Sequence, residues 1–320
     1  MTEQTDRLVD EIHRLQEGWT RRHEEERIAE LLTSVTGIEL TELKNALNRR
    51  DDHHDLEELV FSDIDDESIR ERILSHFASA ARDLGRVGVK VLSDIDDTVF
   101  PMIHERRYPR GHTPVPGALP FLQALDDGPV DNPLSRGDLT FLTARPEVAF
   151  GLVEGSTKDA LRKAGIASSS VLAGALTNLH TKDAMADGKM ANVEHYRLLF
   201  PEYGKVFVGD SGQGDVLVGQ RMREEHPEAI PAVFIHDVVA TEAGERARLA
   251  ALGVHVVDTY VGAVTIAHGL GLVSDEGVTR VVDETVAALD EVAWEDPRQE
   301  AATRELVLRD VDDAADSVRG

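Results

Sequence analysis

Two aspartates stand two residues apart at the end of an apolar run. Residues 89–92 read Val-Lys-Val-Leu, and Asp94 and Asp96 follow directly after Ser93. Such a run is typical of a buried parallel strand, and ligands of open α/β sheets bind just beyond the carboxyl ends of those strands. If the backbone stays extended for one more step, both carboxylates project to the same side of the chain. The spacing predicts two carboxylates in one small site.

Two close carboxylates repel each other unless a cation lies between them or one of them keeps a proton. With Mg²⁺ bound, one carboxylate can attack phosphorus as a nucleophile while the other, protonated, gives its proton to the leaving oxygen. An isolated Asp-x-Asp is more often an acidic turn that caps the next helix. The residues that accompany Asp94 and Asp96 elsewhere in the chain decide between these two interpretations.

Three later segments offer polar side chains at predicted element ends. An apolar strand after Asp138 ends in Thr143, Lys189 opens a predicted helix, and a strand over 205–208 runs into a glycine-rich loop with Asp210 and Asp215. The carboxyl ends of parallel strands share one edge of a sheet, so these residues can meet there. A nucleophile, an acid, a hydroxyl, an ammonium and metal-binding carboxylates are the groups that phosphoryl transfer requires.

The elements that must position these residues alternate between strand and helix. Strands are predicted over 89–92, 138–143, 171–173, 205–208, 232–236 and 254–257, and helices over 117–125, 147–164, 190–200 and 242–252. This alternation predicts an α/β fold, a parallel sheet with helices on both faces. We place this domain at residues 85–275, between a separate helical N-terminal domain at 1–84 and C-terminal helices at 276–320.

The ordered motifs resemble those of the haloacid dehalogenase-like (HAD-like) phosphohydrolases: Asp-x-Asp-x-Thr after a strand, a strand ending in Thr or Ser, a Lys, and an acidic pair. The resemblance spans about 88–260 and implies a Rossmann-like sheet; short inserts indicate a minimal cap. It implies that Asp94 forms an aspartyl-phosphate and that Asp96 is the general acid and then the base. It also implies that Thr143 and Lys189 hold the phosphoryl group, and that Mg²⁺ binds Asp94, the Asp96 carbonyl and Asp210, with Asp215 supporting the metal or Lys189.

Within that superfamily, residues 93–98, Phe200-Pro201 and 208–215 resemble the catalytic domain of the actin-patch-associated phosphatidate phosphatases and their bacterial relatives. The second motif, residues 141–146, has the generic superfamily form and lacks the aromatic and serine-rich segment expected of those lipid phosphatases. The resemblance implies a Mg²⁺-dependent phosphomonoester hydrolase. An uncapped site can admit phosphatidate or another large phosphorylated substrate, either lipid or macromolecular.

The segment after Thr98, residues 100–116, is the densest positive patch in an acidic chain, with His104, Arg106, Arg107, Arg110 and His112. Its place beside Asp94 predicts either a solvated loop or a flap that closes on an anionic substrate, with the three arginines as substrate contacts. A lipid substrate requires these arginines to carry the contact with the membrane surface.

Sixty acidic and thirty-four basic residues give a formal net charge of -26, which disfavours general nucleic-acid binding. The chain has no cysteine, which excludes disulfides, thiolate ligands and a cysteine nucleophile. The first residues lack the pattern of a secretory signal, and no apolar run approaches the roughly 20 residues of a membrane helix. We expect a cytoplasmic protein without a transmembrane segment.

Residues 1–84 carry apolar stripes at helical spacing and predict a small bundle that can serve a protein partner. Residues 51–55, Asp-Asp-His-His-Asp, are interpreted as a solvated loop, because five consecutive residues cannot all converge on one metal ion. Residues 62–66 repeat the pentapeptide 93–97, yet a polar segment precedes them. They predict a helix start with an Asp N-cap and no chemistry.

A second hypothesis is a phosphate-binding regulatory or scaffolding protein without turnover. Such a protein has no need of Asp96 as an acid, so the complete set of catalytic residue types favours the enzyme.

Overall fold

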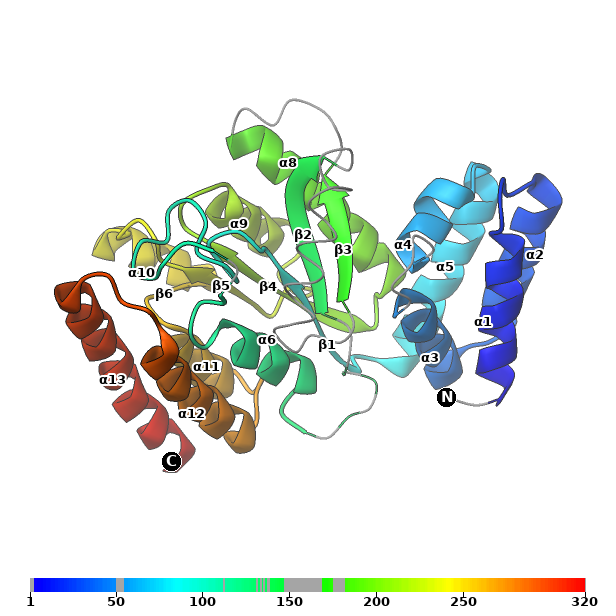
Figure 1. Cartoon of the computed structure of the whole chain (residues 1–320). Coiled ribbons are helices and arrows are strands. Elements are labelled where there is room, and N and C mark those ends of the chain that lie inside the picture. Colours follow the sequence, from blue (N-terminus) through cyan, green and yellow to red (C-terminus); the bar gives the residue numbers. More distant parts are fainter. Residues whose placement is uncertain are drawn as a thin grey trace.

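The computed structural model describes residues 3–49, 55–111, 113–130, 132, 134, 136, 139–146, 169–174 and 182–319. In this part of the chain, six parallel strands form one sheet with the order β3-β2-β1-β4-β5-β6 (Figure 1). The strands are β1 Gly88–Ser93, β2 Leu139–Pro146, β3 Ser169–Gly174, β4 Tyr203–Asp210, β5 Ala232–His236 and β6 Val254–Val257. The predicted parallel α/β sheet is confirmed.

The chain builds this sheet outward in two directions from its centre. It runs from β1 to β2 and β3 on one side, and then crosses to β4, β5 and β6 on the other. The reversal lies between β1 and β4, which pair from Gly88 with Tyr203 to Ser93 with Val208. Ligands of open α/β sheets bind at such a reversal, outside the carboxyl ends of the strands. Asp94 and Asp210 both lie at this position.

The helices surround the sheet and form the predicted N-terminal region. The N-terminal elements are α1 Glu3–Leu15, α2 Arg22–Thr33, α3 Gly37–Asn48, α4 Leu56–Glu58, the π-helical turn η1 Leu59–Asp63 and α5 Glu67–Leu84. The remaining helices are α6 Ala118–Asp127, α8 Lys182–Leu199, α9 Asp215–Glu225, α10 Ala243–Ala251, α11 Tyr260–Gly269, α12 Asp275–Glu291 and α13 Pro297–Arg319. The helix expected over 147–164 and the loop residues 51–54 lie outside the described residues.

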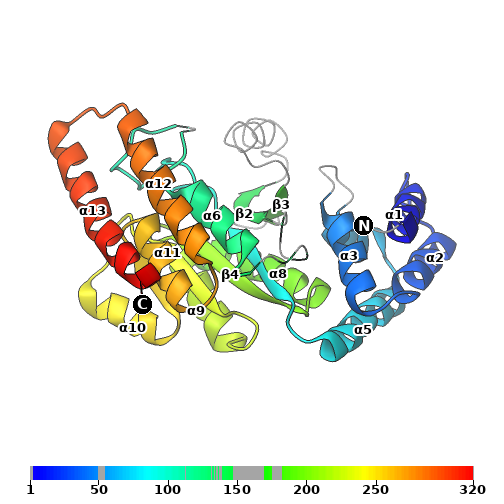
Figure 2. The ribbon, with the colours of Figure 1, turned by 90° about the horizontal axis from the view of Figure 1, so that it is seen from below.

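Alternate residues of each strand pack on opposite faces of the sheet, as the two-residue period of a strand requires. In β1, Leu92 joins the apolar cluster formed with α8, α9 and the N-terminal helices, whereas Val91 joins the cluster formed with α6, α11, α12 and α13. Figure 2 shows α11, α12 and α13 on one flank of the molecule and the N-terminal helices on the other. The prediction of helices on both faces is confirmed.

Buried polar contacts attach α3 to the amino edge of the sheet. Lys44 Nζ lies 2.8 Å from a carboxylate oxygen of Glu202, the residue before β4, and both side chains are almost fully buried. Asn45 Nδ2 donates to Tyr203 Oη at 2.9 Å, and Lys90 Nζ donates to Asn45 Oδ1 at 3.0 Å. The N-terminal helices are therefore joined to the sheet by specific hydrogen bonds as well as by apolar packing.

The repeated pentapeptide 62–66 behaves as a helix start. The Asp66 carboxylate accepts hydrogen bonds from the backbone N–H groups of Ser68 and Ile69, which opens α5. Side-chain capping of this kind satisfies N–H groups that have no partner within the helix. The predicted Asp N-cap is confirmed.

Candidate active site

Four buried charged side chains meet at the carboxyl edge of the sheet. Asp94 follows β1, Asp210 ends β4, Asp215 begins α9 and Lys189 comes from α8. Lys189 Nζ donates to Asp94 Oδ1 at 2.6 Å and to Asp215 Oδ1 at 2.5 Å. The topology thus brings together four residues that the sequence places in three distant segments.

Lys189 does not open its helix, as the sequence predicted, but lies inside it. Helix α8 begins at Lys182, and Gly188 is an interior position of the helix rather than a turn. Glycine inside a helix costs roughly 1 kcal/mol relative to alanine, which packing of the helix can offset. Helical residues therefore precede and follow Lys189, which fixes its backbone.

Three carboxylates of this cluster have the arrangement of a metal site. Asp94, Asp210 and Asp215 each offer an oxygen within 4.8 Å of the others. Among the described residues, Asp94 Oδ2 and Asp210 Oδ2 are buried without a hydrogen-bond partner. Carboxylate oxygens are the preferred ligands of Mg²⁺ and Ca²⁺. The residues present therefore fit a divalent cation.

The electrostatics of the site also favour a cation. Burial raises the pKa of Asp94 to about 7, with the charges of Asp215 and Asp96 adding to the rise and Lys189 opposing it. Burial and the charges of Asp215 and Asp94 raise the pKa of Asp210 to about 9. Burial lowers the pKa of Lys189, but its ion pairs with Asp215 and Asp94 outweigh this and raise it above its usual value. Three carboxylates and one ammonium leave negative charge that a divalent cation can balance.

Tight backbone packing shapes the acidic loop after β4. Asp210 Oδ1 accepts the N–H of Gly212 at 2.6 Å, and Asp215 Oδ2 accepts the N–H of Asp210 at 3.3 Å. A Cβ at Gly209 would lie 2.5 Å from Asp215 Oδ2, so only glycine fits there. The glycines of this loop allow the two carboxylates to approach the backbone.

The other predicted catalytic residues lie around this cluster. Asp96 is partly exposed, and its charge is close enough to raise the pKa of Asp94. Thr143 lies in β2, two residues beyond the Phe141 that pairs with Ser93 of β1, at the same edge of the sheet. The side chain of Thr143 lies outside the described part of the structure.

Asp97, which the sequence analysis did not single out, organises the segment after β1. Its backbone is left-handed, with φ of 63°. Its carboxylate accepts the N–H groups of Met102, Ile103 and Glu105 at Oδ1 and that of His104 at Oδ2, over 2.7 to 3.2 Å. Four donors on one buried carboxylate fix the beginning of the predicted flap. The only signal in the sequence is a further aspartate after Asp-x-Asp.

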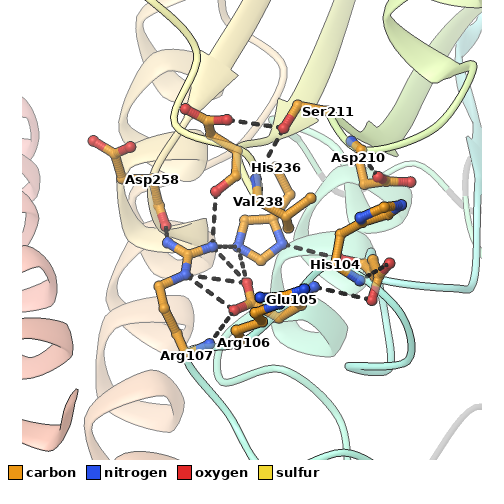
Figure 3. A network of polar contacts seen from close by, with 12 residues as sticks. His104, Glu105, Arg106, Arg107, Asp210, Ser211, His236, Val238 and Asp258 are labelled. Carbon is orange, nitrogen blue, oxygen red and sulfur yellow. Dashed lines mark hydrogen bonds and ion pairs between the residues drawn. The ribbon is translucent and has the colours of Figure 1, made fainter.

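Arg107 points into the protein, as Figure 3 shows, and its side chain is not placed as the flap prediction assumed. Its guanidinium contacts Glu105 at 2.5 Å and donates to the backbone carbonyls of Asp258 at 2.6 Å and Asp237 at 3.0 Å. The guanidinium also lies 2.5 Å from His236 Nε2. Burial, and after it the charge of Arg107 as the second cause, lowers the pKa of His236 to about 4.

Because its donors bind other groups of the protein, Arg107 is not among the substrate contacts that we propose. Arg106 and Arg110 are exposed on the same segment and remain predicted contacts. His112 lies outside the described residues. The arginine patch is therefore divided between Arg107, which is half-buried and bonded within the protein, and the exposed pair Arg106 and Arg110.

The fold and the buried cluster define an α/β protein with a candidate metal centre at the carboxyl edge of its sheet. The family model for the catalytic domain of phosphatidate phosphatase APP1 matches residues 89–237, a segment that contains Asp94, Lys189, Asp210 and Asp215. This match confirms the resemblance to the actin-patch-associated phosphatidate phosphatases over that segment. Comparisons with curated proteins and with solved structures gave no match. No helix among the described residues has the length and apolarity needed to cross a membrane.

Proposed function

We propose that the chain is a Mg²⁺-dependent phosphomonoester hydrolase of the HAD-like type, with phosphatidate as the first candidate substrate. The observation that carries the proposal is the environment of the two carboxylate oxygens of Asp94. One carboxylate oxygen is held by Lys189 at 2.6 Å, while the other is buried at a reversal of the sheet and has no hydrogen-bond partner within the part of the chain that the structure describes. The family match supports the reaction class.

In the proposed mechanism, Asp94 attacks the phosphorus atom and the ester P–O bond breaks. Asp96 gives its proton to the leaving oxygen, and then removes a proton from the water that hydrolyses the aspartyl-phosphate. Lys189 holds Asp94 in place and balances its charge, and Thr143 holds the phosphoryl group with Lys189. Hydrolysis releases inorganic phosphate and returns Asp94 to its carboxylate form.

We assign the metal ligands to Asp94, Asp210 and the backbone carbonyl of Asp96, with Asp215 supporting the site. A bound Mg²⁺ supplies positive charge to the phosphoryl oxygens and relieves the repulsion among the carboxylates. The Oδ2 atoms of Asp94 and Asp210, which have no hydrogen-bond partner among the residues that the structure describes, support this assignment. The raised pKa values of the same two residues support it as well.

We take phosphatidate as the first candidate substrate because the family that matches is named for a phosphatidate phosphatase. Arg106 and Arg110 are exposed and cationic in a chain of net charge -26, so they are the residues that we assign to an anionic substrate or its surface. A large soluble phosphoester would use the same two residues.

The test is phosphate release from para-nitrophenyl phosphate, sugar phosphates, nucleotides, phosphopeptides and phosphatidate in mixed micelles, with Mg²⁺ or with EDTA. We expect release that requires Mg²⁺ and is abolished in Asp94→Asn, with phosphatidate as the best substrate. Asp94→Asn keeps the shape of the side chain and removes its nucleophilic oxygen. Release by Asp94→Asn at the wild-type rate would overturn the assignment of the nucleophile. Binding of phosphate without any release would favour a regulatory protein.

A further inference from the structure

His104 lies at the rim of the candidate active site and is held there from two sides. Its backbone N–H donates to Asp97 Oδ2 at 2.7 Å. Its side chain packs on Gly212, where an added Cβ would lie 2.5 Å from His104 Cδ2 and 2.7 Å from Cγ. Figure 3 shows His104 next to the loop that carries Asp210. A glycine at position 212 is what allows the imidazole to occupy this place.

The imidazole is available for an external hydrogen bond. His104 is partly exposed, and among the described residues neither ring nitrogen takes part in a hydrogen bond. The N–H of Gly212, beneath the ring, donates to Asp210 Oδ1, so the ring lies beside a predicted metal ligand. The metal cluster itself consists of Asp94, Asp210 and Asp215, without His104.

Two cationic side chains near the ring already bind groups of the protein. Lys189 binds two carboxylates, and Arg107 binds Glu105 and two backbone carbonyls. A phosphoryl group that enters the acidic cluster needs hydrogen-bond donors on its outer side, where water would otherwise solvate it. An imidazole N–H at the rim can supply one.

The geometry points to His104 as a substrate-contacting residue that donates a hydrogen bond to an oxygen of the bound phosphomonoester. This inference rests on the proposed function and deepens it. The sequence analysis assigned contact with the anionic substrate to the three arginines of this segment. We assign part of that contact to His104, which Asp97 and Gly212 hold in place. His104 thus binds and orients the phosphate, whereas the carboxylates bind the metal.

The first test compares His104→Ala, His104→Gln and the wild type in phosphate release at saturating Mg²⁺. A hydrogen bond to a charged group contributes about 1.5–3 kcal/mol, so His104→Ala should lose roughly 10- to 100-fold in kcat/KM. His104→Gln should recover most of the loss, because its amide can donate. The Mg²⁺ concentration for half-maximal rate should stay unchanged. His23→Ala, an exposed histidine on α2, is the matched control and should behave as the wild type.

The second test moves the ring without removing it. Gly212→Ala places a methyl group where the ring now lies, and should reduce kcat/KM about as much as His104→Ala. The double variant pairs Gly212→Ala with His104→Gly, because the His104 Cβ itself would lie 2.9 Å from the added Cβ. Its loss should match that of His104→Gly alone instead of the sum. An additive double variant would mean that the ring and Gly212 act independently, and would overturn the inference.

A readout without turnover separates this inference from the proposed function. Isothermal titration with inorganic phosphate in the presence of Mg²⁺ should show affinity about 10-fold or more weaker in His104→Ala than in the wild type. Failure of the function appears as no release by the wild type, while this difference in phosphate affinity can still be measured. Equal phosphate affinity in the two proteins, or a change confined to Mg²⁺ affinity, would reduce His104 to a packing residue.

Discussion

Lys189 Nζ and Asp94 Oδ1 lie 2.6 Å apart although 95 positions separate them in the chain. Both side chains are buried, and the same ammonium also binds Asp215 at 2.5 Å. A buried ammonium between two carboxylates makes each of the three charges dependent on the others. Each of the site variants below changes this balance in a defined direction.

Removing the ammonium should damage both stability and turnover. Lys189→Met leaves Asp94 and Asp215 as buried carboxylates without their partner, which typically costs about 3–5 kcal/mol of unfolding free energy. Loss of the positive charge near the phosphoryl group should reduce kcat by at least about 100-fold. Denaturant unfolding and phosphate release measure the two effects. Because the carboxyls can take up protons, the stability loss should be smaller at pH 6 than at pH 8.5; the opposite order would contradict the charge argument.

The effect of Mg²⁺ on stability should grow with pH. The folded-state pKa values of Asp94, about 7, and Asp210, about 9, lie above the ordinary carboxyl value. The metal-free folded protein therefore loses their stabilising contribution as pH rises from about 4 through these values. Mg²⁺ binds the ionised carboxylates, so its increase of the melting temperature should be larger at pH 8.5 than at pH 6.

Asp210→Asn is the matched control for that measurement. At pH 8.5 the metal-free folded protein must either keep a proton on Asp210 or bury its charge, and asparagine removes both costs, so the variant should be roughly 1–3 kcal/mol more stable than the wild type. It should also lose most of the Mg²⁺-dependent stabilisation. A Mg²⁺ effect equal to that of the wild type would exclude Asp210 as a ligand.

The buried pair Lys44–Glu202 should dominate the attachment of the N-terminal helices. Glu202→Gln should cost about 3–5 kcal/mol in denaturant unfolding, and more than Lys44→Met. The reason is that the Glu202 charge also opposes the burial that lowers the pKa values of Lys90 and Lys205. The double variant Lys44→Met/Glu202→Gln should cost less than the sum of the single variants. Additivity would show that the two side chains do not depend on each other.

Asp97 should control the order of the segment 100–111. Asp97→Ala removes the acceptor of four backbone N–H groups, so limited trypsin digestion should cleave faster after Arg106 and Arg110. Asp97→Asn tolerates the left-handed backbone and keeps one acceptor oxygen, so it should show a smaller effect. Both variants should lower kcat/KM in the same order. Equal cleavage of all three proteins would argue against this anchoring role.

The sequence predicted the parallel sheet well because apolar runs and polar strand ends carry a direct signal. The strand predicted at 171–173 is β3, residues 169–174, and the strand at 254–257 is β6 as predicted. Asp94, Asp210 and Asp215 could be named because strand ends in a parallel sheet share one edge, and Lys189 because an ammonium beside them suits phosphoryl transfer. The roles given to them, the division at residues 84 and 275 and the cytoplasmic location stay predictions.

The errors came from side chains whose partners are distant in sequence. Arg107 looks like a surface arginine until the fold brings Asp258 and His236 beside it. Nothing in the sequence around Lys44 and Asn45 indicates that they contact Glu202 and Tyr203, which lie 158 positions away. Gly188 suggested a turn because glycine is common in turns, and a local pattern cannot show that packing keeps the helix continuous at this residue. Long-range polar contacts have no local signature.

Strand β4 is joined to the N-terminal helices at its beginning and ends in the acidic site. Glu202 precedes the strand and binds Lys44, while Asp210 closes the strand seven steps after Tyr203, about 23 Å away at the usual rise per residue. The helical attachment and the carboxylates therefore lie at opposite ends of one strand. A protein partner of the N-terminal helices, which we predict, would meet the sheet at the end away from the carboxylates.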